Sequence, residues 1–338
     1  MASPATADLT VSPVGADSDL RAALEDLRMG RHLAARDLLI RTGLNWSLLA
    51  RRCHLLVSDP SARGVIKTWR DDEPHSRHAS LLWARALTHG ALQLHREGRA
   101  DSVVCRAGVM AHEEWNRAQS LWPESPEPWN GRLQLARLPY DPQFLDPSWR
   151  SRRQPWDRLD DVEMHLSGPW PLWAEANERH PGDRDAHHRM REYFLQHRGA
   201  VPALQFSQWI VSARRPYTEL LMLPLYALMD LYRERHGSGQ RGALGFWQTE
   251  QAHHFAMRAF REWFSPIPEA EHRWLSPWDL NHLAHALVSC SESGAARQVF
   301  NALGPYATPQ PWKDVNASLG RSQDWTDEFL RIRATVLK

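Results

Sequence analysis

The sequence has little lysine, few cysteines and no long apolar run. Only three of its 41 basic residues are lysine, so arginine carries almost all of the positive charge. The three cysteines, Cys53, Cys105 and Cys290, are an odd number without a close pair, which indicates neither a disulfide framework nor a zinc knuckle. We expect Cys105 and Cys290 to be buried thiols within helices.

The chain also lacks the marks of export and of membrane insertion. Its first ten residues, M-A-S-P-A-T-A-D-L-T, have neither the basic start nor the apolar core of a signal peptide. The longest apolar stretch, residues 220–229, contains Pro224 and is too short to span a bilayer. We therefore expect a soluble cytoplasmic protein that makes no contact with a membrane.

The composition is that of a globular protein without a strong electrostatic preference. Of its 338 residues, 42% are hydrophobic and 24% are charged, which excludes a disordered chain. The net charge of +1 gives no general attraction to nucleic acid, so we expect no nucleic-acid partner. The 17 tryptophans are unusually many, and they either fill the space between helices or line a groove.

A distinctive seam lies at residues 118–133, which read A-Q-S-L-W-P-E-S-P-E-P-W-N-G-R-L. Pro123 cannot continue a helix, because it lacks an N–H and clashes with the preceding turn. Ser125 is predicted to cap the next helix, with Pro126 at the first helical position. Trp129 is large enough to wedge between neighbouring helix pairs.

The same Ala-to-Pro spacing recurs at residues 176–181, where Asp183 is the predicted cap of the following helix. Residues 276–279 and 308–312 contain further helix starts of the same kind. Units of this type cannot bury an apolar face alone and must stack to do so. We predict an all-α fold of antiparallel helix hairpins, with the chain reversing direction near Pro123 and Pro181.

These seams resemble the tetratricopeptide repeat, a 34-residue helix–turn–helix in which an Ala and a Pro close one unit and an aromatic residue opens the next. The repeats are degenerate, since the two seams lie 58 residues apart. The resemblance implies a right-handed superhelical stack of hairpins, a tetratricopeptide-like solenoid whose concave groove binds peptides or proteins. The matching residues are Ala118, Pro123, Trp129, Ala176, Pro181 and, in the aromatic place, His187.

We interpret residues 1–16 as a disordered tail and residues 17–338 as a single α-helical domain with a long loop at 138–157, either functional or an insertion. The pattern from residue 58 to 78 is mixed, with Pro60 and Pro74 as helix breakers, and essentially no sheet is predicted. A kink is expected at Pro224. The predicted helices cover about 18–28, 33–39, 46–57, 84–94, 104–122, 158–180, 184–197, 201–213, 217–235, 252–263, 280–287, 296–303 and 325–336.

Our first functional hypothesis is a protein- or peptide-binding adaptor without a cofactor. Aromatic and arginine side chains are the usual anchors of such interfaces. Those on the first helices after the two seams are therefore the candidate groove residues. They are Trp129, Arg132, His187, Arg191 and Tyr193.

The alternative hypothesis is an enzyme on a helical-repeat scaffold, metal-dependent through clustered histidines and belonging to a specialised biosynthetic pathway. The chain has 18 histidines, and His282 and His285 are three residues apart, on one side of a predicted helix. His254, or an acid such as Glu250, is the candidate third ligand. The competing interpretation is that these are ordinary polar residues on helix faces.

Overall fold

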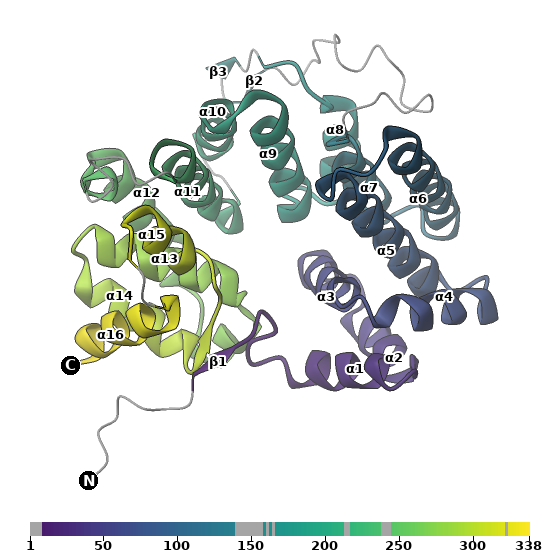
Figure 1. The fold of residues 1–338 in the computed structure, drawn as a ribbon, viewed down its shortest axis with the longest axis horizontal. Coiled ribbons are helices and arrows are strands. Elements are labelled where there is room, and N and C mark those ends of the chain that lie inside the picture. The colour runs from purple at the N-terminus through teal and green to yellow at the C-terminus, as the bar shows by residue number, and fades with distance from the viewer. Residues whose placement is uncertain are drawn as a thin grey trace. The chain divides into compact units, whose positions relative to one another are not determined.

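The computed structural model describes residues 9–138, 158–159, 162–163, 166–212, 217–237, 245–321 and 324–338. It is built almost entirely of helices, which confirms the predicted all-α class (Figure 1). The chain groups into two compact units. The N-terminal unit is Ser18–Gly199; the C-terminal unit is Ala200–Lys338 with the described residues before Ser18. The single domain over 17–338 stays a prediction.

Among its described residues, the N-terminal unit has one short strand pair and is otherwise built of helices and the turns between them. The antiparallel strands β2 (Arg158–Leu159) and β3 (Val162–Glu163) form that pair. The helices are α1 (Ser18–Arg28), α2 (Leu33–Thr42), α3 (Trp46–Ser58), α4 (Ala62–Asp72), α5 (Arg77–Arg96), α6 (Asp101–Leu121), α7 (Glu127–Leu135), α8 (Trp170–Arg179) and α9 (Arg184–Arg198).

The C-terminal unit contains α-helices, short 3-10 helices and a π-helical segment. The strand β1 (Thr10–Val11) pairs in parallel with β4 (Tyr306–Ala307). Its helices are α10 (Ala200–Val211), η3 (Thr218–Met222), α11 (Leu223–His236), η4 (Phe246–Gln248), α12 (Glu250–Arg258), η5 (Ala259–Phe264), η6 (Glu269–Trp274), α13 (Pro277–Ser289), α14 (Ser293–Leu303), α15 (Trp312–Ser318) and α16 (Trp325–Leu337).

None of the helices described here is both long enough and apolar enough to cross a lipid bilayer.

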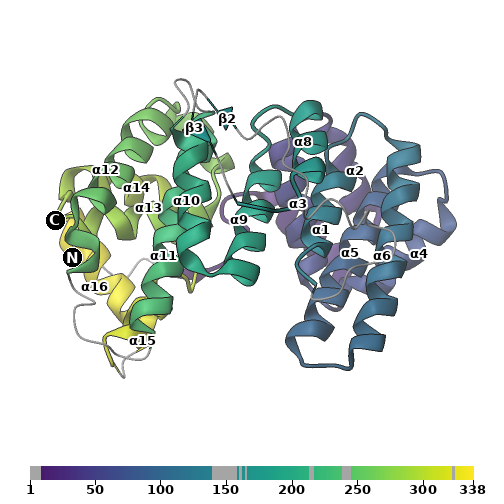
Figure 2. The ribbon, with the colours of Figure 1, turned by 90° about the horizontal axis from the view of Figure 1, so that it is seen from above.

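Helices of the N-terminal unit pack in two rows. Helices α3, α5, α7 and α9 pack one against the next, and α3 also contacts α9; we call these four the inner helices. Helices α4, α6 and α8 each pack on the inner helix that follows in the chain. Figures 1 and 2 show the longest hairpin, α5 and α6, side by side. Because only four residues join these two helices, they run antiparallel, as predicted.

Trp115 of α6 joins α5, α6 and α7. Its side chain is fully buried, and its indole Nε1 donates a hydrogen bond to Thr88 Oγ1 of α5 at 2.8 Å. The ring lies against Gly131 of α7, where a Cβ atom would overlap it. The missing side chain at Gly131 therefore sets how closely α6 and α7 approach each other.

Both predicted seams are helix boundaries. Helix α6 ends at Leu121 and α7 begins at Glu127, with Ser125 Oγ accepting from the Glu127 backbone N–H at 3.2 Å. The cap position itself is Pro126, one residue later than predicted. At the second seam, Asp183 accepts from two backbone N–H groups and caps α9 as predicted.

Three sequence predictions about helices were wrong. Helix α4 fills much of the segment 58–78, because Ala62, Ile66 and Trp69 are spaced as one buried stripe. The helix expected from residue 158 begins only at Trp170, and residues 158–163 contain β2 and β3 instead. Pro224 does not kink a helix. It lies in the first turn of α11, where proline needs no N–H.

The N-terminal segment and the cysteines also differ from expectation. Part of the predicted disordered tail is ordered, since β1 pairs with β4 and Val14 is buried. Cys105 and Cys290 are half-buried, and only Cys53 is a fully buried thiol. Residues 139–157 of the predicted loop lie outside the described residues.

Candidate functional site

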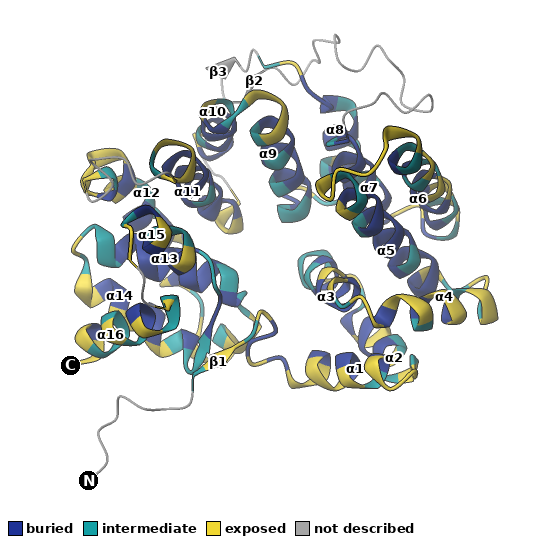
Figure 3. Cartoon of the chain, viewed as in Figure 1, coloured by how far each residue is buried: buried dark blue, intermediate teal, exposed yellow. Residues whose placement is uncertain are grey.

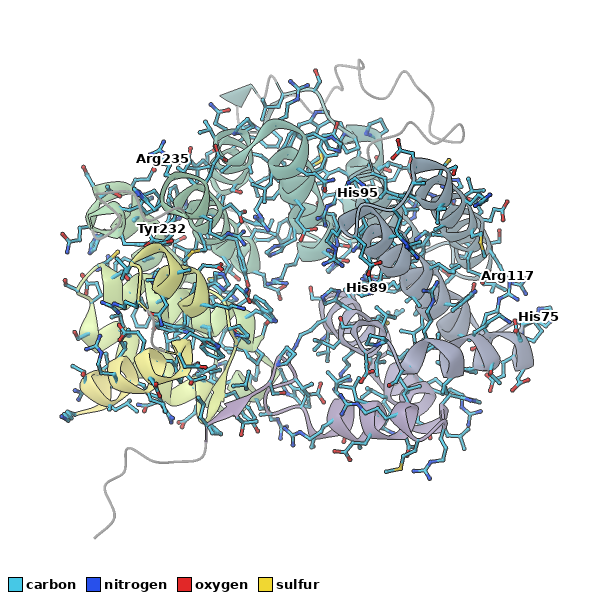
Figure 4. The ribbon with its side chains drawn as sticks, in the orientation of Figure 1. His75, His89, His95, Arg117, Tyr232 and Arg235 are labelled. Atoms are coloured by element: carbon cyan, nitrogen blue, oxygen red, sulfur yellow. The ribbon has the colours of Figure 1, made fainter. Side chains whose placement is uncertain are left out.

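The inner helices of the N-terminal unit share a charged and polar face. Figure 4 shows His89 and His95 on the side of α5 toward α3 and α9, and His75 and Arg117 on the opposite, outer side. Residues three or four apart on a helix lie on one side, so a few positions on each helix build this face. We call it the polar inner face. It consists of His54, Arg85, His89, Glu127, Asn130, Arg137, Asp185, Arg189 and Glu192.

Arg85 of α5 is the centre of this face. Its Nε donates to Glu127 Oε2 of α7 at 2.6 Å, and its Nη2 donates to Asp185 Oδ2 of α9 at 2.7 Å. Only 4% of the Arg85 side chain is exposed, and none of Glu127. One guanidinium therefore ties three inner helices together in a site that solvent barely reaches.

A second arginine extends the network along α9. Arg189 Nη2 lies 3.1 Å from Asp185 Oδ1, and its Nη1 donates to Glu192 Oε2 at 3.1 Å. Arg137, just after α7, donates to the same Glu192 oxygen at 2.6 Å. Charges of opposite sign thus alternate along the face.

Burial and pairing shift the pKa values of the three acids in different directions. Burial raises the pKa of Glu127 to about 7, although Arg85 opposes the shift. Burial also acts on Asp185, but Arg189 and Arg85 outweigh it and hold the pKa of this carboxyl well below its usual range. Glu192 is likewise buried, but Arg137 and Arg189 lower its pKa to about 2. Asp185 and Glu192 are therefore charged at neutral pH.

Three buried polar atoms of this face have unused hydrogen-bonding capacity within the described part of the chain. They are Glu127 Oε1, Asn130 Oδ1 and Arg189 Nε. A buried polar group without a partner costs about 1–3 kcal/mol, so such atoms need an explanation. Two acceptors and one donor on one face can be satisfied by water or by a ligand that carries both donors and acceptors.

The two predicted groove residues on α7 lie on the other side of that helix. At 100° per residue, Trp129 and Arg132 point away from Glu127 and Asn130. Arg132 Nη2 donates to Asn116 Oδ1 of α6 at 2.7 Å, and its guanidinium carbon lies 4.5 Å from the centre of the Trp129 ring. Arg132 thus packs toward α6, and the Trp129 ring also contacts the guanidinium group of Arg179 in α8.

The predicted groove residues on α9 are also packed between helices. The His187 ring meets Trp173 of α8 edge-on at 5.3 Å, and its Nδ1 donates to the Asp183 carbonyl at 2.6 Å. Tyr193 packs beside Phe194, and both Tyr193 and Arg191 are buried. That these residues line a binding groove stays a prediction, whereas the polar inner face uses other residues of the same helices.

The three predicted metal ligands lie in the C-terminal unit in different surroundings. His285 is buried between the rings of Trp247 and Trp312, at 5.0 and 5.4 Å. His282 lies 4.3 Å from the Tyr226 ring, and His254 is exposed on α12. Among the residues that the structure describes, no three His, Cys, Asp or Glu side chains are grouped to hold a metal ion.

Buried histidines make the stability of the protein dependent on pH. Burial lowers the pKa of His78, His112 and His187 to about 4 and that of His285 to about 3. The unfolded chain takes up protons near pH 6.5 while the folded chain does not. The free energy of unfolding should therefore be highest above pH 6.5 and fall as the pH decreases toward 4, by up to about 3 kcal/mol per histidine.

Urea denaturation between pH 4 and 8 measures this dependence. We expect His285→Gln to reduce its slope by up to about 1.4 kcal/mol per pH unit, and His254→Gln, at an exposed position, to leave it unchanged. Glu127 has the opposite effect. Because its pKa is raised, its contribution to the free energy of unfolding decreases as the pH rises from about 4.5 to 7. A free energy of unfolding that is constant from pH 4 to 6.5 would contradict neutral, buried histidines.

Comparison with protein-family models and with curated proteins found no match.

Proposed function

We propose that the N-terminal unit is a protein- or peptide-binding module of a cytoplasmic adaptor, and that the polar inner face is its binding surface. The observation that carries this proposal is the unused hydrogen-bonding capacity of Glu127, Asn130 and Arg189 on that face. A folded chain satisfies nearly all of its buried polar atoms, so these three favour a ligand that completes them.

An extended peptide has the required chemistry. Its main chain presents N–H donors and C=O acceptors alternately, so it has partners for Glu127 Oε1, Asn130 Oδ1 and Arg189 Nε. These atoms are buried in the unbound chain, so we propose that the side chains covering them move aside when a peptide binds. The charges of the face are already balanced among Arg85, Asp185 and their neighbours. Main-chain recognition, rather than capture of one charged group, is therefore the mode that we propose.

The tetratricopeptide-like arrangement is part of the same proposal. The row of inner helices, each followed by an outer helix that packs on the next inner one, supports it. So do the two seams, where a proline separates helices that pack together. The binding mode inferred from the family would place the peptide along the inner helices, and the polar inner face lies there.

A pair of matched histidine variants tests the proposal. Peptides are selected from a random displayed library on the immobilised full chain, and their affinities are measured by fluorescence anisotropy. His54 and His75 are both exposed, but only His54 lies on the polar inner face. We expect His54→Ala to weaken binding by about tenfold, or about 1.4 kcal/mol, and His75→Ala to leave it within about twofold.

The thermal midpoint should be the same for both variants and the wild type, since neither side chain is buried. Failure to enrich any peptide would contradict the proposed function. The proposed surface would be wrong if the enriched peptides bound His54→Ala as tightly as the wild type.

A further inference from the structure

The first hairpin of the N-terminal unit exposes an unusual concentration of large apolar side chains. Of the ten such side chains exposed in the described part of the chain, four lie between residues 29 and 44. They are Met29 (67% exposed), Leu33 (52%), Ile40 (55%) and Leu44 (67%). Figure 3 shows the exposed surface of α1 and α2 at this edge of the unit.

Helix α2 is apolar on both sides. Its inward side buries Ala35, Leu38 and Leu39, while Leu33 and Ile40 point outward. At 100° per residue, Leu33, Asp37, Ile40 and Arg41 fall within about 100° of arc, so they form one stripe. Leu44 lies in the turn that follows the end of α2 at Thr42. The outer side of α2 therefore combines exposed apolar and charged side chains, as interaction surfaces often do.

The charges on this stripe indicate what covers it. Asp37 and Arg41 are 53% and 59% exposed. Their nearest ionic partners, Arg36 and Asp19, are both at 3.5 Å, the long end of hydrogen-bonding distance. Neither charge is therefore committed to a tight contact within the chain.

We propose that α2 docks against α2 of a second copy of this chain. If two α2 helices pack antiparallel about a two-fold axis near residue 39, Asp37 of each copy faces Arg41 of the other. In the same register Leu33 of each copy lies at the end of α2 that leads into the Leu44 turn of the other copy, and the two Ile40 side chains lie close to the axis. The stripe is thus self-complementary in charge and in apolar surface, as a two-fold interface requires. This inference is independent of the proposed peptide-binding function.

Charge exchange tests this interface directly. The full chain is examined by sedimentation equilibrium over a wide range of concentrations. We expect a concentration-dependent dimer for the wild type. Asp37→Arg and Arg41→Asp, each placing like charges opposite one another twice, should each lower the association constant by about tenfold or more. The double variant restores opposite charges and should recover it to within about threefold.

Two glutamate substitutions test whether the apolar side chains of the stripe contribute to dimerisation. Ile40 and Met110 are both 55% exposed, but Met110 lies on α6, away from the stripe. Ile40→Glu should abolish dimerisation, and Met110→Glu should not change it. Circular dichroism and the thermal midpoint should be unchanged in all five variants. A wild type that stays monomeric at every concentration, a double variant that fails to recover, or an Ile40→Glu variant that still dimerises would each overturn the proposal.

Discussion

Replacing Arg85 with methionine is expected to lower the free energy of unfolding by about 3–5 kcal/mol. The substitution keeps most of the side-chain volume but removes the guanidinium that pairs with Glu127 and Asp185. Glu127 has no exposed side-chain surface and its pKa is already raised to about 7, so without Arg85 its carboxyl must either stay charged without a cation beside it or take up a proton, and both cost free energy. Urea denaturation at pH 7.5 measures the loss.

A second substitution separates the lost pairing from lost packing. Glu127→Gln in the Arg85→Met background removes the cost of burying or protonating this carboxylate, so the double variant should be more stable than Arg85→Met alone. Arg28→Met is the comparison at the surface. Arg28 pairs with Asp59 at 2.6 Å but is 58% exposed, so we expect a loss of at most about 1 kcal/mol. Equal losses for Arg28→Met and Arg85→Met would show that Arg85 is not effectively buried.

The buried ion pairs that Arg85 and Arg189 form on the polar inner face are an inefficient way to stabilise a helical unit. Well-packed apolar residues in place of a buried ion pair are often as stabilising or more so, because the charges must first lose their hydration. In this protein the network also leaves Glu127 Oε1 and Arg189 Nε without partners in the described part of the chain. Stability alone therefore does not account for these charges, and the proposed binding function would provide a reason for them.

The hairpin of α5 and α6 could be predicted because each helix carries a long stripe of apolar residues at helical spacing. Val104, Ala111, Trp115 and Ala118 are all buried, as the pattern requires. Helix α4 was missed because Pro60 and Pro74 lie close on both sides of it and suggested a broken segment. The prolines in fact lie just outside its ends, where they are compatible with a helix.

The polar inner face could not be predicted in the same way. Arg85 contacts residues 42 and 100 positions later in the chain, and only the packing of the inner helices brings them together. In the sequence, Asp185, Arg189 and Glu192 form an ordinary charged stripe, which usually marks a solvated helix face. The groove prediction followed aromatic residues such as Trp129 and His187 instead, and the structure places these between helices.

Replacing Gly131 with alanine is expected to destabilise the protein by about 3 kcal/mol, the upper end of the usual cost of overpacking a core. The added methyl group would overlap the indole ring of Trp115. That ring cannot easily move, because it is fully buried and its Nε1 is hydrogen-bonded to Thr88. Helices α6 and α7 would have to separate, and the inner helices would shift with them. Urea denaturation gives the loss of free energy.

The same glycine-to-alanine substitution at Gly64 of α4 is expected to have the opposite effect and to stabilise the protein. No atom lies within 4 Å of the place where its Cβ would be, so Gly64→Ala should raise the free energy of unfolding by about 0.5–1 kcal/mol through helix propensity alone. The difference of about 4 kcal/mol between two glycine-to-alanine changes in one unit then measures the contact with Trp115. Trp115→Phe removes part of the indole, so Gly131→Ala should cost less in that background than in the wild type. If Gly131→Ala were as stabilising as Gly64→Ala, α7 could not lie against Trp115 as the structure places it, and the arrangement of the inner helices that positions Glu127 beside Arg85 would have to be revised.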